Sequence, residues 1–296
     1  MKFSNHHIKY CTLALLTAAV GLSSCKKDGN PNNLPDVDPS QYAGKVDGFA
    51  STDEIYPNNM VAYWSFDANT NETKSNAAPT TATNATVVDG GIKGKALNLS
   101  AGSLYYGTQF NAFKAATFKN FTISTWVQIA NNGSSKTMLF QLARPGMLTG
   151  NINFILETNV LPASDVANLV VHPTFTTLGG GTQDNLNADR TLAIGLARWT
   201  HIALTYNGST GIFNIIANGK NIGSYSNRGT GNNVFNSFEP NEVIIGGNYN
   251  VVPGKTVSAD ASFAAMTGKM DEVRIYNIAM PDALVKSIYT LGLMGK

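Results

Sequence analysis

The chain has 296 residues, of which 43% are hydrophobic and 14% charged, and this length is enough to build a core without disulfide bonds. Its 21 Lys and Arg nearly balance its 19 Asp and Glu. Nucleic-acid binding needs a basic patch that this balance does not indicate, so a nucleic-acid partner is excluded.

The first 24 residues have the pattern of a secretion signal. Two lysines and no acid accompany an apolar run at 10–22, which is too short to span a bilayer. The run ends in Leu22-Ser23-Ser24-Cys25, which resembles the lipobox of bacterial lipoproteins. That resemblance implies cleavage before Cys25 and acylation of its thiol and amine, which would anchor the protein stably to a membrane. The alternative is an ordinary secretion signal that contains a cysteine.

Residues 25–56 are predicted to be the lipidated cysteine followed by a flexible tether. This stretch is rich in Asn, Gly and Pro and has little apolar periodicity, so it cannot bury enough surface to fold alone. The other cysteine, Cys11, leaves with the signal. The mature chain therefore keeps no thiol for a disulfide or a thiolate metal site.

From residue 57 the chain changes to short apolar or alternating runs separated by turn residues. Residues 121–129 alternate as a half-buried strand does, and Asn218-Gly219 predicts a two-residue hairpin turn. Further strands are predicted at 61–66, 96–99, 103–106, 137–142, 152–156, 199–206, 212–216, 221–225, 243–246 and 269–276. The strands at 96–99 and 103–106 are expected to form a hairpin around Ala101-Gly102. One helix is predicted at 281–291, with Pro281 in its first turn.

This spacing predicts an all-β fold, an antiparallel sandwich over residues 57–296 with a short C-terminal helix. Four motifs carry a family resemblance: Val61-Ala62-Tyr63-Trp64-Ser65-Phe66-Asp67, Phe121-Thr122-Ile123-Ser124-Thr125-Trp126-Val127, Arg198-Trp199-Thr200-His201-Ile202-Ala203-Leu204-Thr205-Tyr206 and Met270-Asp271-Glu272-Val273-Arg274-Ile275-Tyr276-Asn277. In this order, over residues 57–292, they resemble a laminin-G-like domain of the concanavalin A-like lectin/glucanase superfamily. The resemblance implies a jelly roll whose first and last strands pair, and it implies no particular activity.

Two stretches, 157–198 and 226–239, are longer than in the simplest members of that family. Loops inserted into a rigid scaffold are where new binding properties are expected. Four aromatic residues in or beside long loops are candidates for stacking on sugar rings, although each has packing as its alternative: Phe175, Tyr225, Phe235 and Tyr249. The three tryptophans fall inside strand patterns and are predicted to lie in the core.

Asp67 and Asp271 are the candidate metal ligands. Asp67 ends the first predicted strand and Asp271 lies near the start of the last, so antiparallel pairing would bring their carboxylates together. Close like charges are unfavourable unless a cation or hydrogen-bond donors compensate them. The resemblance implies calcium, which takes about six to eight oxygen ligands. The alternative is that Asp67 caps the following turn and Asp271 accepts hydrogen bonds from loop amides.

The sequence argues against an enzyme. Relatives that are retaining glucanases place three carboxylates at alternate positions of one strand, with acid and nucleophile about 5 Å apart. Here Asp271 and Glu272 are adjacent, and adjacent strand residues point to opposite faces. Loop carboxylates that remain free to pair are Glu157, Asp165, Asp184, Asp189 and Glu239. His201 is predicted to be a hydrogen-bonded sheet histidine, and His172 has no assigned role.

The favoured hypothesis is a non-catalytic binding module that recognises a glycan. It would be lipid-anchored in the outer membrane of a Gram-negative envelope and exposed at the cell surface. The glycan rests on analogy of fold, and fold does not imply function. The alternative is an adhesion or assembly subunit with an envelope protein as its partner, and a glycoside hydrolase is the third hypothesis.

Overall fold

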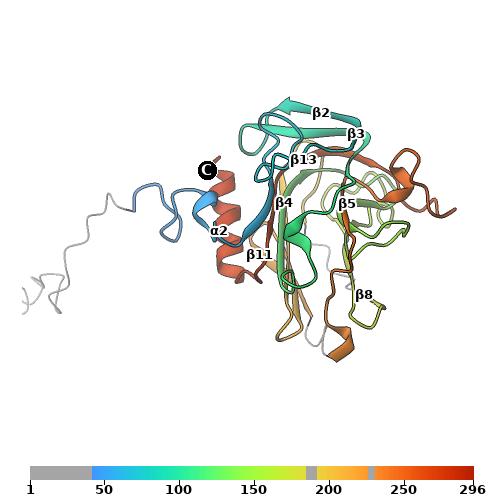
Figure 1. The fold of residues 1–296 in the computed structure, drawn as a ribbon. Helices are drawn as coiled ribbons and strands as arrows, with labels where there is room; N and C mark the ends of the chain where they lie inside the picture. Colours follow the sequence, from blue (N-terminus) through green and yellow to red (C-terminus); the bar gives the residue numbers. More distant parts are fainter. Residues whose placement is uncertain (1–41, 185–191, 226–230) are drawn as a thin grey trace, which may run out of the picture. The chain divides into compact units, whose positions relative to one another are not determined.

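The computed structural model describes residues 42–184, 192–225 and 231–296 (Figure 1). The chain divides into two compact units, Met1–Gly44 and Lys45–Lys296. In the first unit only residues 42–44 are described, and they form a turn. The predicted signal, Cys25 and most of the predicted tether therefore lie outside the described residues. Within the described ranges, no helix has the length and apolar character needed to cross a membrane.

The second unit begins before residue 57, so the predicted tether is too long at its C-terminal end. Val46 and Phe49 form a short antiparallel bridge, and the 3-10 helix η2 (Thr52–Glu54) follows. Ile55 is buried with other apolar residues of this unit. Thr52 donates hydrogen bonds to the carbonyl of Lys296 through its amide and its hydroxyl. A few apolar side chains in an otherwise polar stretch are thus enough to hold it on the domain.

The described residues contain one antiparallel sheet of thirteen strands. The strands are β1 (Met60–Trp64), β2 (Thr81–Asp89), β3 (Lys95–Tyr106), β4 (Phe121–Gln128), β5 (Thr137–Ala143), β6 (Ile152–Leu156), β7 (Val171–Thr176), β8 (Thr182–Asp184), β9 (Thr200–Asn207), β10 (Ile212–Ala217), β11 (Lys220–Tyr225), β12 (Glu242–Ile245) and β13 (Met266–Tyr276). Their order is β11-β10-β9-β4-β13-β3-β12-β5-β6-β7-β8, with β1 beside β13 and β2 beside β3. This confirms the predicted all-β class.

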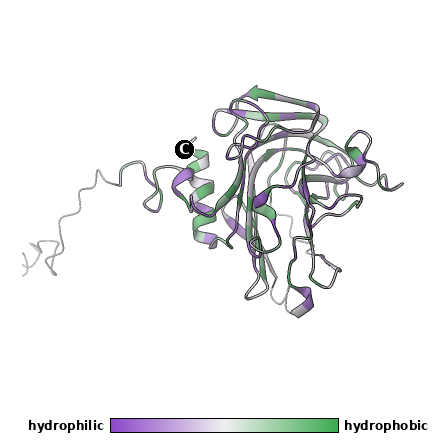
Figure 2. Cartoon of the chain, viewed as in Figure 1, coloured by the Kyte–Doolittle hydropathy of each residue, from purple (hydrophilic) through white to green (hydrophobic). Residues whose placement is uncertain are grey.

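The sheet curls so that its two ends face each other across one apolar core. The ring of Phe175 on β7 lies 5.0 Å from Tyr206 on β9 and 5.9 Å from Phe213 on β10, although these strands are far apart in the sheet order. Inward-facing residues of β4, β5, β6, β9 and β12 belong to the same buried cluster. Figure 2 shows the apolar residues distributed along these strands. The curl therefore makes a sandwich from a single sheet.

The C-terminal helix α2 (Asp282–Leu293) covers the outer face of the β4–β9–β10 layer (Figure 1). Ala203 and Ile216 of this layer form a second buried cluster with apolar side chains of the helix. The Trp126 ring stacks on Tyr289 at 5.5 Å, and a Cβ at Gly292 would lie 2.6 Å from that indole. Strand β4 is consequently buried on both faces, which corrects its prediction as a half-buried strand.

The first and last strands pair as predicted. Strand β1 runs antiparallel to β13, with Tyr63 opposite Arg274 and Trp64 opposite Val273. The pairing of β13 with β3 shifts register between Met266 and Thr267, and its pairing with β4 shifts between Asp271 and Arg274. The N-terminal half of β13 pairs with β3 rather than with β1. The seam between the two ends of the folded unit therefore contains irregular strand pairing.

Four strands differ from the sequence prediction. Residues 96–106 form one bent strand rather than a hairpin, because Ala101 takes a left-handed conformation (φ 49°) without reversing the chain. Its partner β2 was not predicted, and Asn84 of β2 makes the matching left-handed bulge (φ 46°). Strands β7 and β8 lie inside 157–198, which the sequence suggested was an irregular insertion.

Candidate functional site

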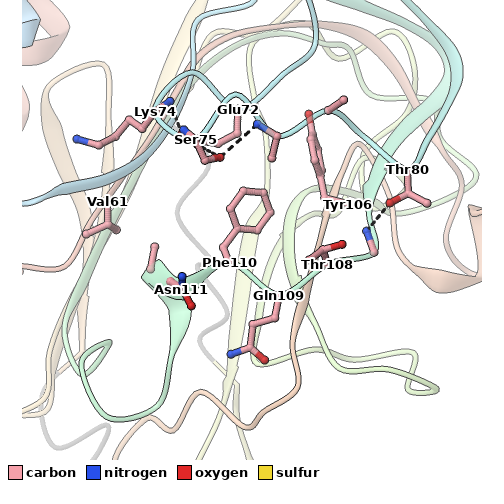
Figure 3. Close-up of a pocket in the computed structure, with 14 residues that line it drawn as sticks. Val61, Glu72, Lys74, Ser75, Thr80, Tyr106, Thr108, Gln109, Phe110 and Asn111 are labelled. Atoms are coloured by element: carbon pink, nitrogen blue, oxygen red, sulfur yellow. Dashed lines mark hydrogen bonds between the residues drawn. The ribbon is translucent and has the colours of Figure 1, made fainter.

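A cavity of about 520 Å³ opens beside the C-terminal end of β3 (Figure 3). One wall is the loop between β1 and β2, and the other is the segment that joins β3 to the 3-10 helix η3 (Asn111–Phe113). The labelled lining residues are Val61, Glu72, Lys74, Ser75, Thr80, Tyr106, Thr108, Gln109, Phe110 and Asn111. Five of these ten are polar and uncharged, two are charged and two are aromatic, and Ala77, Ala78, Gly107 and Ala112 complete the lining.

The ring of Phe110 lies between the two walls of this cavity (Figure 3). It is half-buried, because it contacts Trp64 at 6.0 Å and Tyr106 at 5.9 Å edge-on, as well as Phe113 at 5.8 Å. These three neighbours belong to the buried core. Phe110 is therefore an aromatic surface that the core holds in a fixed orientation at the cavity.

Glu72 fixes the loop wall from the inside. Its side chain is 1% exposed, and one carboxylate oxygen accepts hydrogen bonds from the amides of Tyr63 (2.7 Å) and Lys74 (3.0 Å). The other oxygen accepts from the amide (2.6 Å) and hydroxyl (2.5 Å) of Ser75. Four donors compensate the charge of the carboxylate, which ties the loop to β1 and leaves no oxygen directed at a ligand.

Hydrogen bonds also hold the opposite wall. Thr80 accepts from the amide of Gly107 at 2.9 Å, and the hydroxyl of Tyr106 donates to the carbonyl of Thr70. Gln109 donates to Glu239 (2.9 Å) and accepts from the amide of Asn241 (3.2 Å). The walls are thus preorganised, which lowers the entropy cost of binding a ligand between them.

The aromatic residues proposed from the sequence lie elsewhere. Phe175 and Phe235 are buried and pack on each other at 6.0 Å, and Tyr249 is buried against Tyr105 at 6.2 Å. As placed, these three side chains stabilise the interior, and their burial does not fit a role in stacking on a sugar. The backbone of Tyr225 belongs to β11, while its side chain lies outside the described part of the structure.

Phe110 also stands in a loop pattern that the sequence displays. Gly107-Thr108-Gln109-Phe110-Asn111 places an aromatic residue in a short polar loop, the same pattern that selected the other four candidates. The difference between them is the loop wall at 72–80, which the sequence does not bring near Phe110. The pairing of β2 with β3, and of β1 with β13, which itself pairs with β3, brings the two walls of the cavity together.

Asp67 and Asp271 converge on one turn. Asp67 accepts a hydrogen bond from the amide of Lys95 at 3.0 Å, and Asp271 accepts from the amides of Ile92 (2.8 Å) and Lys93 (3.2 Å). The turn at 91–95 thus supplies donors to both carboxylates. Burial, and then the nearby charge of Glu272, raises the pKa of Asp271 to about 8.

These contacts bear on the calcium prediction. Calcium prefers several ionised or carbonyl oxygens, whereas Asp271 is fully buried and already accepts amide hydrogen bonds. In the described ranges, no group of three or more His, Cys, Asp and Glu side chains is arranged to hold a metal ion. The arrangement fits hydrogen bonding to loop amides, and the calcium site stays a prediction.

Native mass spectrometry in millimolar calcium measures this directly. The calcium prediction requires one bound ion that is lost in Asp67→Asn, because the substitution removes a charged ligand and keeps the side-chain volume. A protein that gains no ion at any calcium concentration up to the millimolar range would contradict it.

The two histidines in the described part of the chain both have partners. His201 is buried in β9 and bonds the hydroxyl of Ser124 through Nε2 at 2.8 Å, as a sheet histidine should. His172 lies on β7, with Glu157 at 2.8 Å from Nδ1 and Asp184 beside Nε2. Two of the loop carboxylates are therefore held by one imidazole. Asp189 lies outside the described residues.

Comparison with known proteins identifies the family of this chain. Residues 102–286 match the family model described as the concanavalin A-like lectin/glucanases superfamily. The chain belongs to this superfamily. A comparison with curated proteins gave no match.

Solved structures share the architecture of this concanavalin A-like domain. The binding domain of Paraclostridial mosquitocidal protein 1 aligns with a TM-score of 0.55 and 19% identity over 78% of this chain and 52% of its own. Domain 4 of AbnA, a GH43 extracellular arabinanase from Geobacillus stearothermophilus in complex with arabinotriose, gives 0.52 and 20% over 78% and 98%. The ligand-binding domain of botulinum neurotoxin serotype D in complex with N-acetylneuraminic acid gives 0.51 and 9% over 81% and 52%.

The chain spans about half the length of the two toxin domains and nearly all of the arabinanase domain. At these identities the likeness shows the fold alone. The predicted jelly roll of the concanavalin A-like superfamily is therefore confirmed, while ligand and location are matters for proposal.

Proposed function

We propose that this protein is a non-catalytic carbohydrate-binding module, and that its sugar site is the cavity at Phe110. The observation that carries the proposal is a half-buried aromatic ring in a preorganised cavity whose lining combines apolar side chains with uncharged polar groups. Ligand sites generally combine an apolar surface with a few positioned polar groups. A pyranose has an apolar face suited to an aromatic ring, and hydroxyls suited to the side chains of Thr108 and Asn111.

The carboxylates of the cavity support a binding role over hydrolysis. Glycosidases need an acid and a second carboxylate roughly 5–9.5 Å apart on the two sides of the bond that is cleaved. Glu72 is the one carboxylate that lines this cavity in the described part of the chain, and its oxygens accept four hydrogen bonds. Neither partner of a hydrolytic pair is directed at a ligand there.

The structural relatives add support from their own ligands. The arabinanase domain that this chain covers almost completely was solved with arabinotriose, and a toxin domain with the fold was solved with N-acetylneuraminic acid. Both are carbohydrates. They motivate a sugar ligand for this chain and do not choose among sugars.

The location is also a proposal. The lipobox at Cys25 would anchor the domain to the outer membrane of a Gram-negative envelope, with the domain at the cell surface. Metabolic labelling with palmitate, compared between wild type and Cys25→Ala, tests the anchor. Protease treatment of intact cells tests the orientation, since a periplasmic domain would be protected.

Replacing Phe110 with alanine should weaken glycan binding by at least about 30-fold, because truncating a central aromatic contact typically costs about 2 kcal/mol or more. A glycan array probed with the purified protein identifies the ligands, and titration calorimetry measures the change in affinity. Phe263→Ala is the matched control, since Phe263 is another half-buried phenylalanine outside this cavity. Equal loss in both variants, or no glycan bound by wild type, would remove support for the site.

A further inference from the structure

The charges around the cavity at Phe110 are unequally compensated. Two charged side chains, Glu72 and Lys74, line it in the described part of the chain. Glu72 is buried and its two oxygens accept four hydrogen bonds. Lys74 is exposed, and no ion pair with its ammonium forms among the described residues.

Glu239 lies outside the cavity lining, contacts the lining residue Gln109, and has hydrogen-bond donors of its own. Glu239 accepts hydrogen bonds from the amide of Ala115 and the side chain of Gln109, both at 2.9 Å. Those two hydrogen bonds, with a smaller contribution from the charge of Lys114, hold the pKa of Glu239 below its usual range. Glu239 is therefore an anion held by these donors, and it forms no ion pair with Lys74 among the described residues.

From this imbalance we infer that the cavity prefers an acidic sugar, whose carboxylate pairs with Lys74 while its ring contacts Phe110. In Figure 3 the side chain of Lys74 leaves the loop that also carries Ser75 and extends, in this view, toward the side of the cavity where Val61 lies. Glu72 holds the backbone of this loop in place, so the anchor of the lysine is fixed while its four-carbon stem remains adjustable. The inference rests on the proposed function and adds the chemical class of the sugar.

A charged hydrogen bond at a partly screened rim is of modest strength. Hydrogen bonds between an ammonium and a carboxylate are about twice as strong as neutral ones, which corresponds to roughly tenfold in affinity. Salt weakens such a pair at an exposed site. The acidic preference should therefore be about tenfold in dilute buffer and smaller in 0.5 M salt, on the order of a few fold.

The test uses two ligand pairs that differ chiefly in charge: sialyllactose against its carboxyl methyl ester, and trigalacturonate against its methyl ester. Calorimetry on wild type, Lys74→Gln, Lys74→Arg and Lys286→Gln measures each affinity. Lys286 is an exposed lysine on α2 outside the cavity and serves as the control. We expect at least one acidic member to bind about tenfold tighter than its neutral partner. Lys74→Gln should abolish that preference, while Lys74→Arg and Lys286→Gln should keep it.

The inference is overturned if neither acidic ligand binds, if acidic and neutral members bind equally, or if the preference survives Lys74→Gln. Its failure is distinguishable from failure of the proposed function. A protein that binds neutral glycans and loses them in Phe110→Ala keeps the carbohydrate site and loses only the acidic preference. A protein that binds no glycan on the array loses both.

Discussion

Replacing Arg274 with alanine should lower the free energy of unfolding by about 3–5 kcal/mol, the usual cost of leaving one buried charge without its partner. The guanidinium is 1% exposed and donates to Glu272, which is also buried, and to Asp53 at 2.8 Å. It also lies 4.4 Å from the centre of the Tyr63 ring. Burial is the largest single effect and would lower the pKa of Arg274, but the charges of Glu272 and the nearby tyrosines and the hydrogen bond to Glu272 together raise it, so the arginine is charged throughout the accessible pH range.

Urea unfolding followed by circular dichroism measures this loss. Arg198→Ala is the matched control, because Arg198 is exposed and its removal should change stability by less than about 0.5 kcal/mol. Losses of equal size in the two variants would show that the buried ion pair does not stabilise the seam between β1 and β13.

Acidification should destabilise the protein through His201. Its pKa is lowered to about 3 by burial, against about 6.5 in the unfolded chain, so the unfolded state binds the proton first. The neutral folded form is favoured fully above pH 6.5, and this contribution is lost as the pH falls toward 3. At about 1.36 kcal/mol per pH unit, the loss between pH 6.5 and pH 4 is about 3 kcal/mol.

His201→Gln should reduce this acid sensitivity, because glutamine can still bond Ser124 and takes up no proton. Urea unfolding at pH 7 and pH 4 for both proteins gives the comparison. Wild type should lose about 3 kcal/mol more than the variant between these conditions. The same loss in both proteins would mean that His201 is protonated without unfolding.

The sequence predicted the parts of the fold that depend on local pattern. Strand β4 alternates along its length, and Asn218-Gly219 forms the expected turn with both residues left-handed (φ 46° and 72°). The motifs at the two ends of the domain gave the pairing of β1 with β13. For β4 and the turn, neighbouring residues contain the necessary information. For the pairing of β1 with β13, the family resemblance supplied the order of the strands.

The parts that it did not predict depend on contacts between distant segments. Strand β2 alternates mostly small and polar residues, so its pairing with β3 decides its structure more than its own pattern does. Phe175 and Phe110 are both aromatic residues near loops, yet one is buried by the facing layer and the other borders a cavity. Neighbouring residues in the sequence do not contain that distinction. The structure therefore supports a site at Phe110 rather than at the aromatic residues predicted from the sequence.

The most direct test of this account is a crystal structure of the protein with the tightest-binding oligosaccharide from the array. The account predicts a sugar ring against Phe110, between the loop at 72–80 and the segment at 107–112, with Glu72 still bonded to the loop amides. A sugar bound at another surface, with the cavity at Phe110 empty, would contradict it.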